Sequence, residues 1–255
     1  MSQRSDIKNG ASSGNAIKTF TMASNCNGNS PDGLPPLPPL PISVADDLRK
    51  SHGFSDQAQW AIPYKLMQGA RPGFGLSDNT SLADQVNKIV GEGKVTTFVS
   101  LQAECLPENG SILLDGGGCR KSEPKNLPPY WKEVETAATQ FSMPPPTFFY
   151  YGIVGMKTAK SIDSLSIAAK DLAKRIKLGE TIYVHCGGGV GRAGLVSACV
   201  MGILYKNLTA DAAIDYTTGL CHLRNLESKE EKHYSSPETE EQKEQVRNFF
   251  EKFRD

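Results

Sequence analysis

Apolar residues recur along the second half of the chain with the spacings of buried helices and strands. Residues 161–178 have apolar positions three or four apart, which predicts a helix, and residues 181–184 form a short apolar run typical of a strand. Residues 192–205 are almost wholly apolar, which predicts a central helix. A further helix is predicted over residues 209–216, with the threonine at position 209 as its N-cap. Residues 238–253 are predicted to form a last helix, which is amphipathic.

The pattern is shorter and more interrupted in the first half. Residues 59–62 and 65–67 resemble two short strands, and residues 94–101 form a β-branched run typical of a buried strand. Residues 81–90 between them have helical spacing. A poorly patterned, glycine-rich stretch, residues 104–129, predicts a loop.

This alternation of strands and helices predicts one α/β domain over residues 57–255, with a mainly parallel central sheet flanked by helices. Residues 1–56 are rich in Ser, Asn, Gly and Pro and poor in apolar positions, which predicts a disordered N-terminal arm. The run from Pro35 to Pro41 favours polyproline II. We expect it to act as a stiff spacer, with docking on an SH3- or WW-type adaptor domain as the alternative.

Composition narrows the possible classes of protein. Lys plus Arg and Asp plus Glu each number 28, so the formal charge is zero and no overall field draws the chain to nucleic acid. No apolar run is long enough to span a membrane, and no secretory signal is visible. The six cysteines lack the spacing of a zinc site, so no metal or cofactor is expected, and a cytoplasmic or nuclear location fits them. Cys199 and Cys221 are expected to be small buried hydrophobes.

One stretch joins a predicted strand to the apolar helix: His185, Cys186, Gly187, Gly188, Gly189, Val190, Gly191 and Arg192. Its glycines let successive N–H groups point inwards at the positive end of the helix, which makes a cradle for phosphate. The same field favours the thiolate of Cys186, a nucleophile, and Arg192 can bind two phosphoryl oxygens at once. The alternative, a glycine turn around an inert cysteine, leaves the arginine unexplained.

This stretch resembles the signature of the protein tyrosine and dual-specificity phosphatases, which is His-Cys, five residues, then Arg. Residues 59–69, 99–101 and 237–242 also look like the small atypical dual-specificity phosphatases. The resemblance covers most of residues 60–253 and implies the fold of the phosphotyrosine protein phosphatases.

The resemblance also implies roles for single residues. Cys186 would form a phosphocysteine, and Arg192 together with residues 187–191 would bind the phosphate. His185 would order the loop, and Gln242 would hold the hydrolytic water.

Two departures from the family pattern bear on turnover. Ala193 stands where the family has Ser or Thr, whose hydroxyl helps the cysteine sulfur to leave, so breakdown of the phosphocysteine should be slow. Residues 146–160, where the family carries its general acid, contain neither Asp nor Glu, and Asp115 and Asp163 are the nearest substitutes. Asp163 is explained by its place in the first turn of a helix. Aryl phosphates should therefore react faster than alkyl phosphates.

The leading hypothesis is a protein phosphatase that hydrolyses phosphotyrosine, with phosphoserine and phosphothreonine as further substrates. The missing acid and Ala193 support an alternative, a pseudophosphatase that binds phosphoproteins with little turnover. Some plant glucan phosphatases are similar in having Arg-Ala here, which keeps a glucan or another non-protein phosphate as a third hypothesis.

Overall fold

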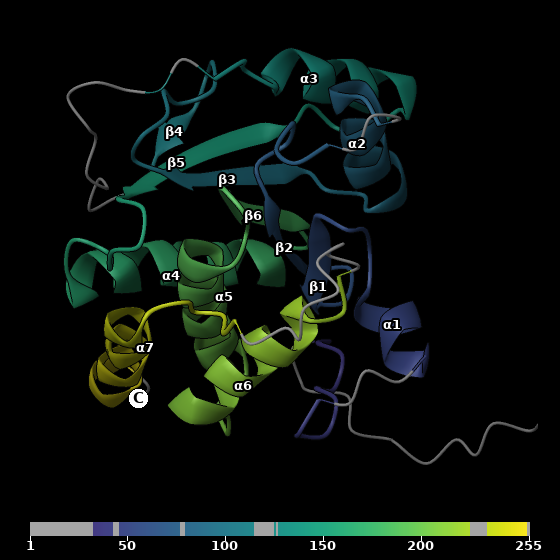
Figure 1. Ribbon diagram of the computed structural model, residues 1–255. Coiled ribbons are helices and arrows are strands. Elements are labelled where there is room, and N and C mark those ends of the chain that lie inside the picture. Colours follow the sequence, from purple (N-terminus) through teal and green to yellow (C-terminus); the bar gives the residue numbers. More distant parts are fainter. Residues whose placement is uncertain are drawn as a thin grey trace, which may run out of the picture.

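The computed structural model describes residues 33–42, 46–76, 80–114, 125, 127–224 and 234–253. A six-stranded sheet lies between two layers of helices (Figure 1). The strands are β1 (Ala58–Ile62), β2 (Leu66–Ala70), β3 (Thr97–Gln102), β4 (Ile112–Leu113), β5 (Thr147–Ile153) and β6 (Ile182–Cys186). The helices are α1 (Asp46–His52), α2 (Leu82–Asn87), the π-helical turn η1 (Lys88–Glu92), α3 (Trp131–Gln140), α4 (Ile162–Lys177), α5 (Gly191–Leu204), α6 (Ala210–Cys221) and α7 (Glu240–Phe253).

The sheet is parallel except at one edge, as the sequence predicted. The strand order is β1-β2-β6-β3-β5-β4, and only β1 and β2 pair in antiparallel fashion. The register places Ala70 beside Cys186, and Ser100 beside His185. The carboxyl ends of β2, β3 and β6 therefore meet at one end of the sheet, where ligands bind in folds of this class.

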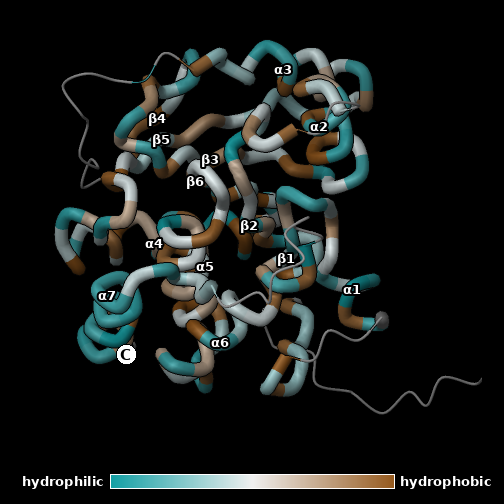
Figure 2. The backbone as a smooth tube through the Cα atoms, in the orientation of Figure 1, coloured by the Kyte–Doolittle hydropathy of each residue, from teal (hydrophilic) through white to brown (hydrophobic). Residues whose placement is uncertain are grey.

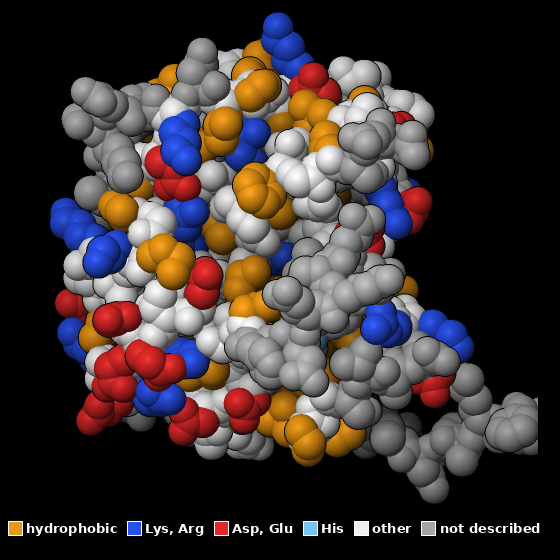
Figure 3. Space-filling view, in the orientation of Figure 1, with side chains coloured by type: hydrophobic (Ala, Val, Ile, Leu, Met, Phe, Trp, Pro, Cys, Tyr) orange, Lys and Arg blue, Asp and Glu red, His pale blue; other side chains and the backbone are white. Residues whose placement is uncertain are grey.

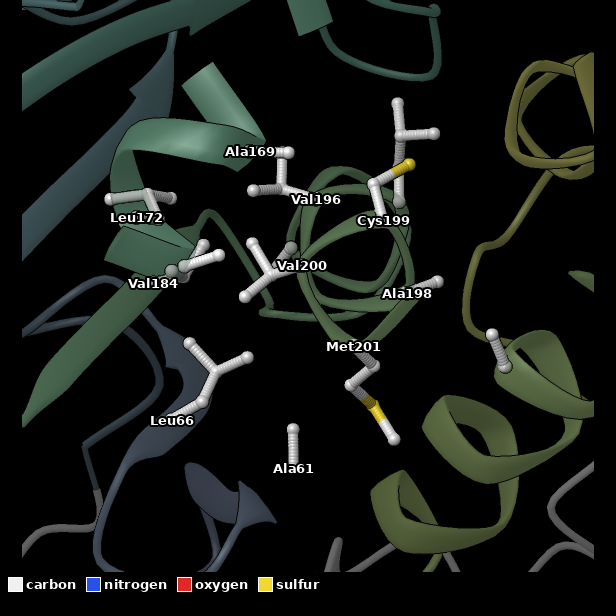
Figure 4. Close-up of a cluster of buried hydrophobic side chains, with 14 of the residues drawn as sticks. Ala61, Leu66, Ala169, Leu172, Val184, Val196, Ala198, Cys199, Val200 and Met201 are labelled. Atoms are coloured by element: carbon white, nitrogen blue, oxygen red, sulfur yellow. The ribbon is translucent and has the colours of Figure 1, made fainter. Parts of the chain in front are cut away.

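Each face of the sheet has its own apolar core. Helices α2 and α3 cover one face, and α4, α5, α6 and α7 lie on the other (Figure 1). Helix α5 is buried along nearly its whole length, and its side chains contact α4 and the strands (Figure 4). Hydrophobic residues accordingly concentrate in the strands and α5, while α7 is largely hydrophilic on its outer side (Figure 2). Burial of α5 gives the loop that precedes it a rigid support.

Local signals in the sequence account for most of the elements. Ser81, Ser161 and Thr209 cap α2, α4 and α6 through their side-chain oxygens, as helix-start residues do. Strand β3 begins at Thr97, three residues later than predicted, and Lys94, the first residue of the predicted strand, has a left-handed backbone with φ of 52° that no strand residue adopts.

Four elements were not predicted: α1, β4, α3 and β5. Helix α3 has apolar residues at helical spacing, Trp131, Val134, Ala137 and Ala138, and the last three are buried, so this signal was present in the sequence and was missed. Strand β5 is a continuous aromatic run that is buried on both faces, so it lacks the alternation of a half-buried strand. Their stability depends on packing against partners that are distant in the sequence.

The predicted disorder through residue 56 is wrong for the residues described there. Residues 33–42, which we call the N-terminal strap, lie against α5 and α6. The Tyr205 hydroxyl donates to the Pro35 carbonyl over 2.8 Å, and the Tyr216 hydroxyl donates to the Pro38 carbonyl over 2.6 Å. Four apolar side chains of the strap pack against the main core: Leu34, Leu37, Leu40 and Ile42.

The strap is therefore bound to the domain rather than free, and α1 follows it as a short helix. Gly219 of α6 is needed for this contact, because a Cβ there would lie 2.4 Å from the Cβ of Ile42. Residues 1–32, also part of the predicted arm, lie outside the described residues. Docking of residues 35–41 on an adaptor domain stays a prediction, and it would have to displace the strap.

The surface seen in Figure 3 mixes acidic and basic side chains, with acidic groups gathered over α7, which has Glu240, Glu241 and Glu244 exposed. Among the described residues, no helix has both the length and the apolar character needed to cross a lipid bilayer.

Candidate active site

The Cys186 loop lies at the carboxyl end of β6, as predicted. Cys186 is the last residue of the strand and is 4% exposed, and α5 begins at Gly191. A cavity of about 290 Å³ opens above the loop. Its lining includes Cys186 and Arg192 from the loop, Gly155 and Met156 after β5, and Glu238 and Gln242 from the start of α7.

The carbonyl groups of the loop are bound from outside the cavity. The backbone N–H of Arg71 donates to the Gly187 carbonyl over 3.0 Å. At the other end of the loop, the Ser236 hydroxyl donates to the Val190 carbonyl over 2.8 Å. These bonds tie both ends of the loop to neighbouring segments.

The middle of the loop is held by Arg224, which sequence reasoning missed. Its guanidinium donates to the carbonyls of Gly188 and Gly189, each over 2.9 Å. The side-chain amide of Gln68 also donates to the Gly189 carbonyl over 2.9 Å. Arg224 is only 1% exposed, so a buried positive charge lies directly beneath the loop.

This outward binding of the carbonyls has a geometric consequence for the amides. Within a planar trans peptide unit the N–H points opposite to the C=O. The N–H groups of residues 188–191 therefore face away from Arg71, Arg224, Gln68 and Ser236 and toward the cavity side of the loop. Such a row of inward amides at a helix N-terminus is an anion-binding site.

The four glycines of the loop differ in whether the structure has room for a side chain at their positions. Gly189 has φ of 74°, and a Cβ there would lie 2.1 Å from the carbonyl carbon of Gly69. At Gly191 a Cβ would lie 2.9 Å from Oε2 of Glu238, whereas at Gly188 nothing lies within 4 Å. The loop therefore requires glycine at position 189, and position 188 is open.

Arg192 lies beside Cys186 and is held by an acid that the sequence analysis did not identify. Its Nη1 and Nη2 donate to the two carboxylate oxygens of Glu104 over 2.7 and 2.9 Å, and Nη1 also donates to the Ile153 carbonyl over 3.0 Å. Burial alone would lower the pKa of Arg192, but the bond to Glu104 and the charges of Cys186 and Glu104 raise it. The guanidinium is thus held in the charged form at the floor of the cavity.

Glu104 could have been found from its position, because it follows β3 by two residues at the ligand-binding end of a parallel sheet. Burial raises the pKa of Glu104, and the hydrogen bond and charge of Arg192 more than offset this, so that its pKa is lowered overall. Glu104 is therefore a carboxylate that orients Arg192.

His185 lies behind the loop and not in the cavity. Its ring is fully buried, and Nε2 lies 2.6 Å from the Tyr130 hydroxyl. Burial, with a smaller contribution from the charge of Arg71, lowers the pKa of His185 to about 3. His185 is consequently a neutral group that supports the loop from beneath, which is compatible with the ordering role expected for it.

Gln242 is fully buried, although a glutamine early in an exposed helix is usually solvated. Its Oε1 accepts from the backbone N–H groups of Glu238 and Thr239 over 3.0 and 3.3 Å, and its Nε2 donates to the Lys157 carbonyl over 3.0 Å. The side chain thereby joins the start of α7 to the segment after β5. It also lines the cavity, as the role of holding a water requires.

The two departures from the family pattern are visible in the structure. Ala193 is fully buried and packs in the main core. The segment after β5 presents Gly155 and Met156 to the cavity in place of a carboxylate. Asp163 lies on α4, where it pairs with Lys252 over 2.8 Å, and Asp115 lies outside the described residues.

The fold and the site together define an α/β domain with a cysteine-centred anion-binding loop. Residues 127–245 match the family described as Swiss Army Knife protein, DSP-PTPase phosphatase domain (PTP-SAK). The matched segment runs from just before α3 into α7 and contains the whole loop. Through this segment, which is less than half of the chain, the protein is similar to the dual-specificity phosphatase family.

A curated relative, phosphatidylglycerophosphate phosphatase PTPMT1 of Arabidopsis thaliana, is 32% identical over 62 residues, which are 24% of this chain and 18% of the relative. The crystal structure of Tk-PTP in the active form has 18% identity and a TM-score of 0.48, covering 77% of this chain and 98% of that chain. PTPMT1 in complex with PI(5)P has 15% identity and a TM-score of 0.47, covering 74% and 91%. The match to the plant relative thus spans less than a fifth of that protein.

Proposed function

We propose that the Cys186 loop is the catalytic centre of a phosphatase that hydrolyses phosphate monoesters through a phosphocysteine. The observation that carries this proposal is the outward binding of the loop carbonyls, which turns the amides toward a cavity that also contains Cys186 and Arg192. A tetrahedral dianion there would meet inward amides, one guanidinium and one sulfur nucleophile.

In the first step the Cys186 thiolate attacks phosphorus, and the ester oxygen leaves. Arg192 and the loop amides stabilise the charge that develops on the phosphoryl oxygens, and Glu104 keeps the guanidinium oriented for this contact. In the second step water displaces the cysteine sulfur and releases inorganic phosphate. Because Ala193 offers the sulfur no hydroxyl, we expect the second step to limit turnover.

The test is hydrolysis of p-nitrophenyl phosphate by the purified chain, Cys186→Ser and Cys199→Ser. The proposal expects turnover by the chain and by Cys199→Ser, which changes a buried cysteine of α5 that does not line the cavity, and loss of at least about 1,000-fold in Cys186→Ser. Equal rates in the chain and in Cys186→Ser would overturn it. Tight vanadate or phosphopeptide binding without turnover would instead identify a phosphate-reading pseudophosphatase.

Phosphotyrosine is the substrate class that we propose. The loop carries no lysine between Cys186 and Arg192, and a phenol is a better leaving group than the alcohol of phosphoserine. The segment after β5 supplies no acid to protonate an alkoxide, which also favours an aryl ester. A phosphotyrosine peptide should therefore give a higher kcat/KM than the matched phosphoserine peptide.

A phospholipid is the second candidate, and the name of the Arabidopsis relative, a phosphatidylglycerophosphate phosphatase, favours it. Met156, 55% exposed at the mouth of the cavity, offers an apolar contact that suits either an aromatic ring or lipid. Assays with phosphatidylglycerophosphate in detergent micelles and with the phosphotyrosine peptide separate the two. Turnover of the lipid alone would replace the protein substrate.

A further inference from the structure

The cavity contains a carboxylate that neither the family pattern nor the sequence analysis assigns. Glu238 lines the cavity together with Cys186 and Arg192. Its Oε2 lies 2.9 Å from the point that a Cβ on Gly191 would occupy, and Oε1 of Gln242 lies 3.0 Å from the same point. The carboxylate and the amide of Gln242 are thus adjacent, over the end of the loop where α5 begins.

The backbone holds Glu238 at this place from both sides. Two residues earlier, the Ser236 hydroxyl donates to the Val190 carbonyl, and the Ser236 N–H donates to the Thr218 hydroxyl over 2.9 Å. On the other side the N–H of Glu238 donates to Gln242 over 3.0 Å. The segment that carries Glu238 is therefore anchored to the loop through Ser236, and Glu238 itself is bonded through its backbone to Gln242, the residue expected to hold the water.

The approach of this segment to α5 is unusually close. A Cβ on Gly194 would lie 2.2 Å from the Ser236 hydroxyl oxygen and 3.0 Å from the backbone nitrogen of Pro237. Gly194 thus lets the residues before α7 contact the first turn of α5.

Two other carboxylates near the site, those of Glu104 and Glu108, already have hydrogen-bond and ion-pair partners. Glu104 is bound by both guanidinium nitrogens of Arg192. Glu108 pairs with Arg71 over 3.1 Å and accepts the Tyr130 N–H over 2.9 Å. Within the described residues, the carboxylate of Glu238 has no hydrogen-bond or ion-pair partner, and the side chain is exposed.

We propose that Glu238 is the acid–base group of this site and replaces the acid missing after β5. The proposal rests on the phosphatase function proposed above. When a phosphoryl dianion occupies the loop, its charge favours the protonated form of the neighbouring carboxyl group. Glu238 then donates its proton to the leaving oxygen as the P–O bond breaks and the Sγ–P bond forms, which releases the alcohol or phenol.

In the second step the same group acts as a base. Water attacks phosphorus, the Sγ–P bond breaks and returns the thiolate, and the Glu238 carboxylate takes the proton of the water. The amide of Gln242, beside it, is placed to orient that water. The two steps together convert ester and water into alcohol and phosphate, and they leave Glu238 protonated for the next turnover.

The experiment compares leaving groups of different basicity in the chain, in Glu238→Gln and in Glu241→Gln. Glu241 is an exposed carboxylate at the start of α7 that does not line this cavity, so it is the matched control. General acid catalysis contributes about 10²–10⁴-fold, and it matters most when the leaving group is poor. Glu238→Gln should therefore lose at least about 100-fold in kcat/KM for phenyl phosphate and much less, below about 10-fold, for p-nitrophenyl phosphate.

Two further readouts distinguish catalysis from folding or binding. Vanadate affinity and the circular dichroism spectrum of Glu238→Gln should match those of the unaltered chain. Equal losses for both esters in Glu238→Gln, or no loss, would overturn the role of Glu238 while leaving Cys186-dependent hydrolysis intact. Cys186-independent hydrolysis would instead overturn the proposed function itself.

Discussion

Gly188 and Gly189 are neighbours in the loop with opposite structural demands. Gly189 has a left-handed backbone and touches Gly69, and Gly188 has open space around its Cα. The sequence does not reveal this difference, because both residues are glycine and the restriction on Gly189 arises from the close approach of β2 to the loop.

Gly189→Ala should destabilise the fold and weaken phosphate binding. A left-handed alanine costs about 1–2 kcal/mol, and the overlap with Gly69 adds to this cost. We expect a fall in Tm of at least about 4 °C and a loss of vanadate affinity, whereas Gly188→Ala should change Tm by less than about 1 °C. Thermal unfolding and vanadate titration of both variants measure the effect. Similar behaviour of the two variants would contradict the conformation of the loop.

Ala193→Ser should raise the steady-state rate of p-nitrophenyl phosphate hydrolysis. Serine adds a single oxygen at a fully buried position and supplies the hydroxyl that the resemblance associates with departure of the sulfur. In rapid mixing, the unaltered chain should show a burst of nitrophenol that the variant reduces. A gain of about 10-fold in kcat corresponds to about 1.4 kcal/mol, close to the lower end of the range for one hydrogen bond to a charged group. An unchanged rate with no burst would show that breakdown of the phosphocysteine is not limiting.

At the scale of elements, the composition of the N-terminal strap predicts disorder, but its contacts with α5 and α6 hold it in one conformation. Polyproline II has no internal hydrogen bonds, so the carbonyls of the strap are available to external donors. Tyr205 and Tyr216 supply two such donors, three residues apart along the strap, at Pro35 and Pro38. The polyproline period of three residues per turn matches this spacing.

The double variant Tyr205→Phe/Tyr216→Phe should therefore lose stability through the strap. Each hydroxyl contributes about 1 kcal/mol, so urea unfolding should show a loss of about 2 kcal/mol. Tyr64→Phe, at an exposed tyrosine with 68% exposure, is the control and should leave the free energy of unfolding within about 0.5 kcal/mol. If the double variant is as stable as the control, the strap does not contribute to folding.

The long segment between β3 and α3 shows how an element without periodicity can still be structurally required. It was predicted to be a loop, and apart from β4 its described part has no regular structure of two or more residues. Its acids nevertheless hold the arginines of the site: Glu104 binds Arg192, and Glu108 binds Arg71. No local pattern in the sequence indicates such pairs, because their partners are 88 and 37 residues away.

At the scale of the whole molecule, buried histidine links stability to pH. Burial lowers the pKa of His185 from 6.5 to about 3, and that of His52 from 6.5 to about 4. At a pH between 6.5 and the lowered value of each histidine, that histidine binds a proton in the unfolded chain but not in the folded chain. The free energy of unfolding is therefore not reduced by these histidines above about pH 6.5, and it decreases as the pH is lowered from 6.5 toward 3.

Urea unfolding at pH 7.5 and pH 5.0 measures this dependence. A histidine excluded from protonation contributes a slope of up to about 1.4 kcal/mol per pH unit, so His185 should account for about 1–2 kcal/mol over this interval. His185→Gln, which does not titrate and keeps a polar group near Tyr130, should show a shallower fall. Equal slopes in the chain and in the variant would contradict a buried neutral His185.

The sequence by itself determined the class of fold and the centre of the site. Periodic apolar positions identified most helices, short apolar runs identified four of the strands, and the His185 to Arg192 stretch identified the loop, because these signals depend only on neighbours in the chain. Tertiary structure decided which groups surround that loop. Arg224, Glu104, Glu238 and the N-terminal strap reach it or its supporting helices from distant segments, and their contacts exist only once the sheet and helices have packed.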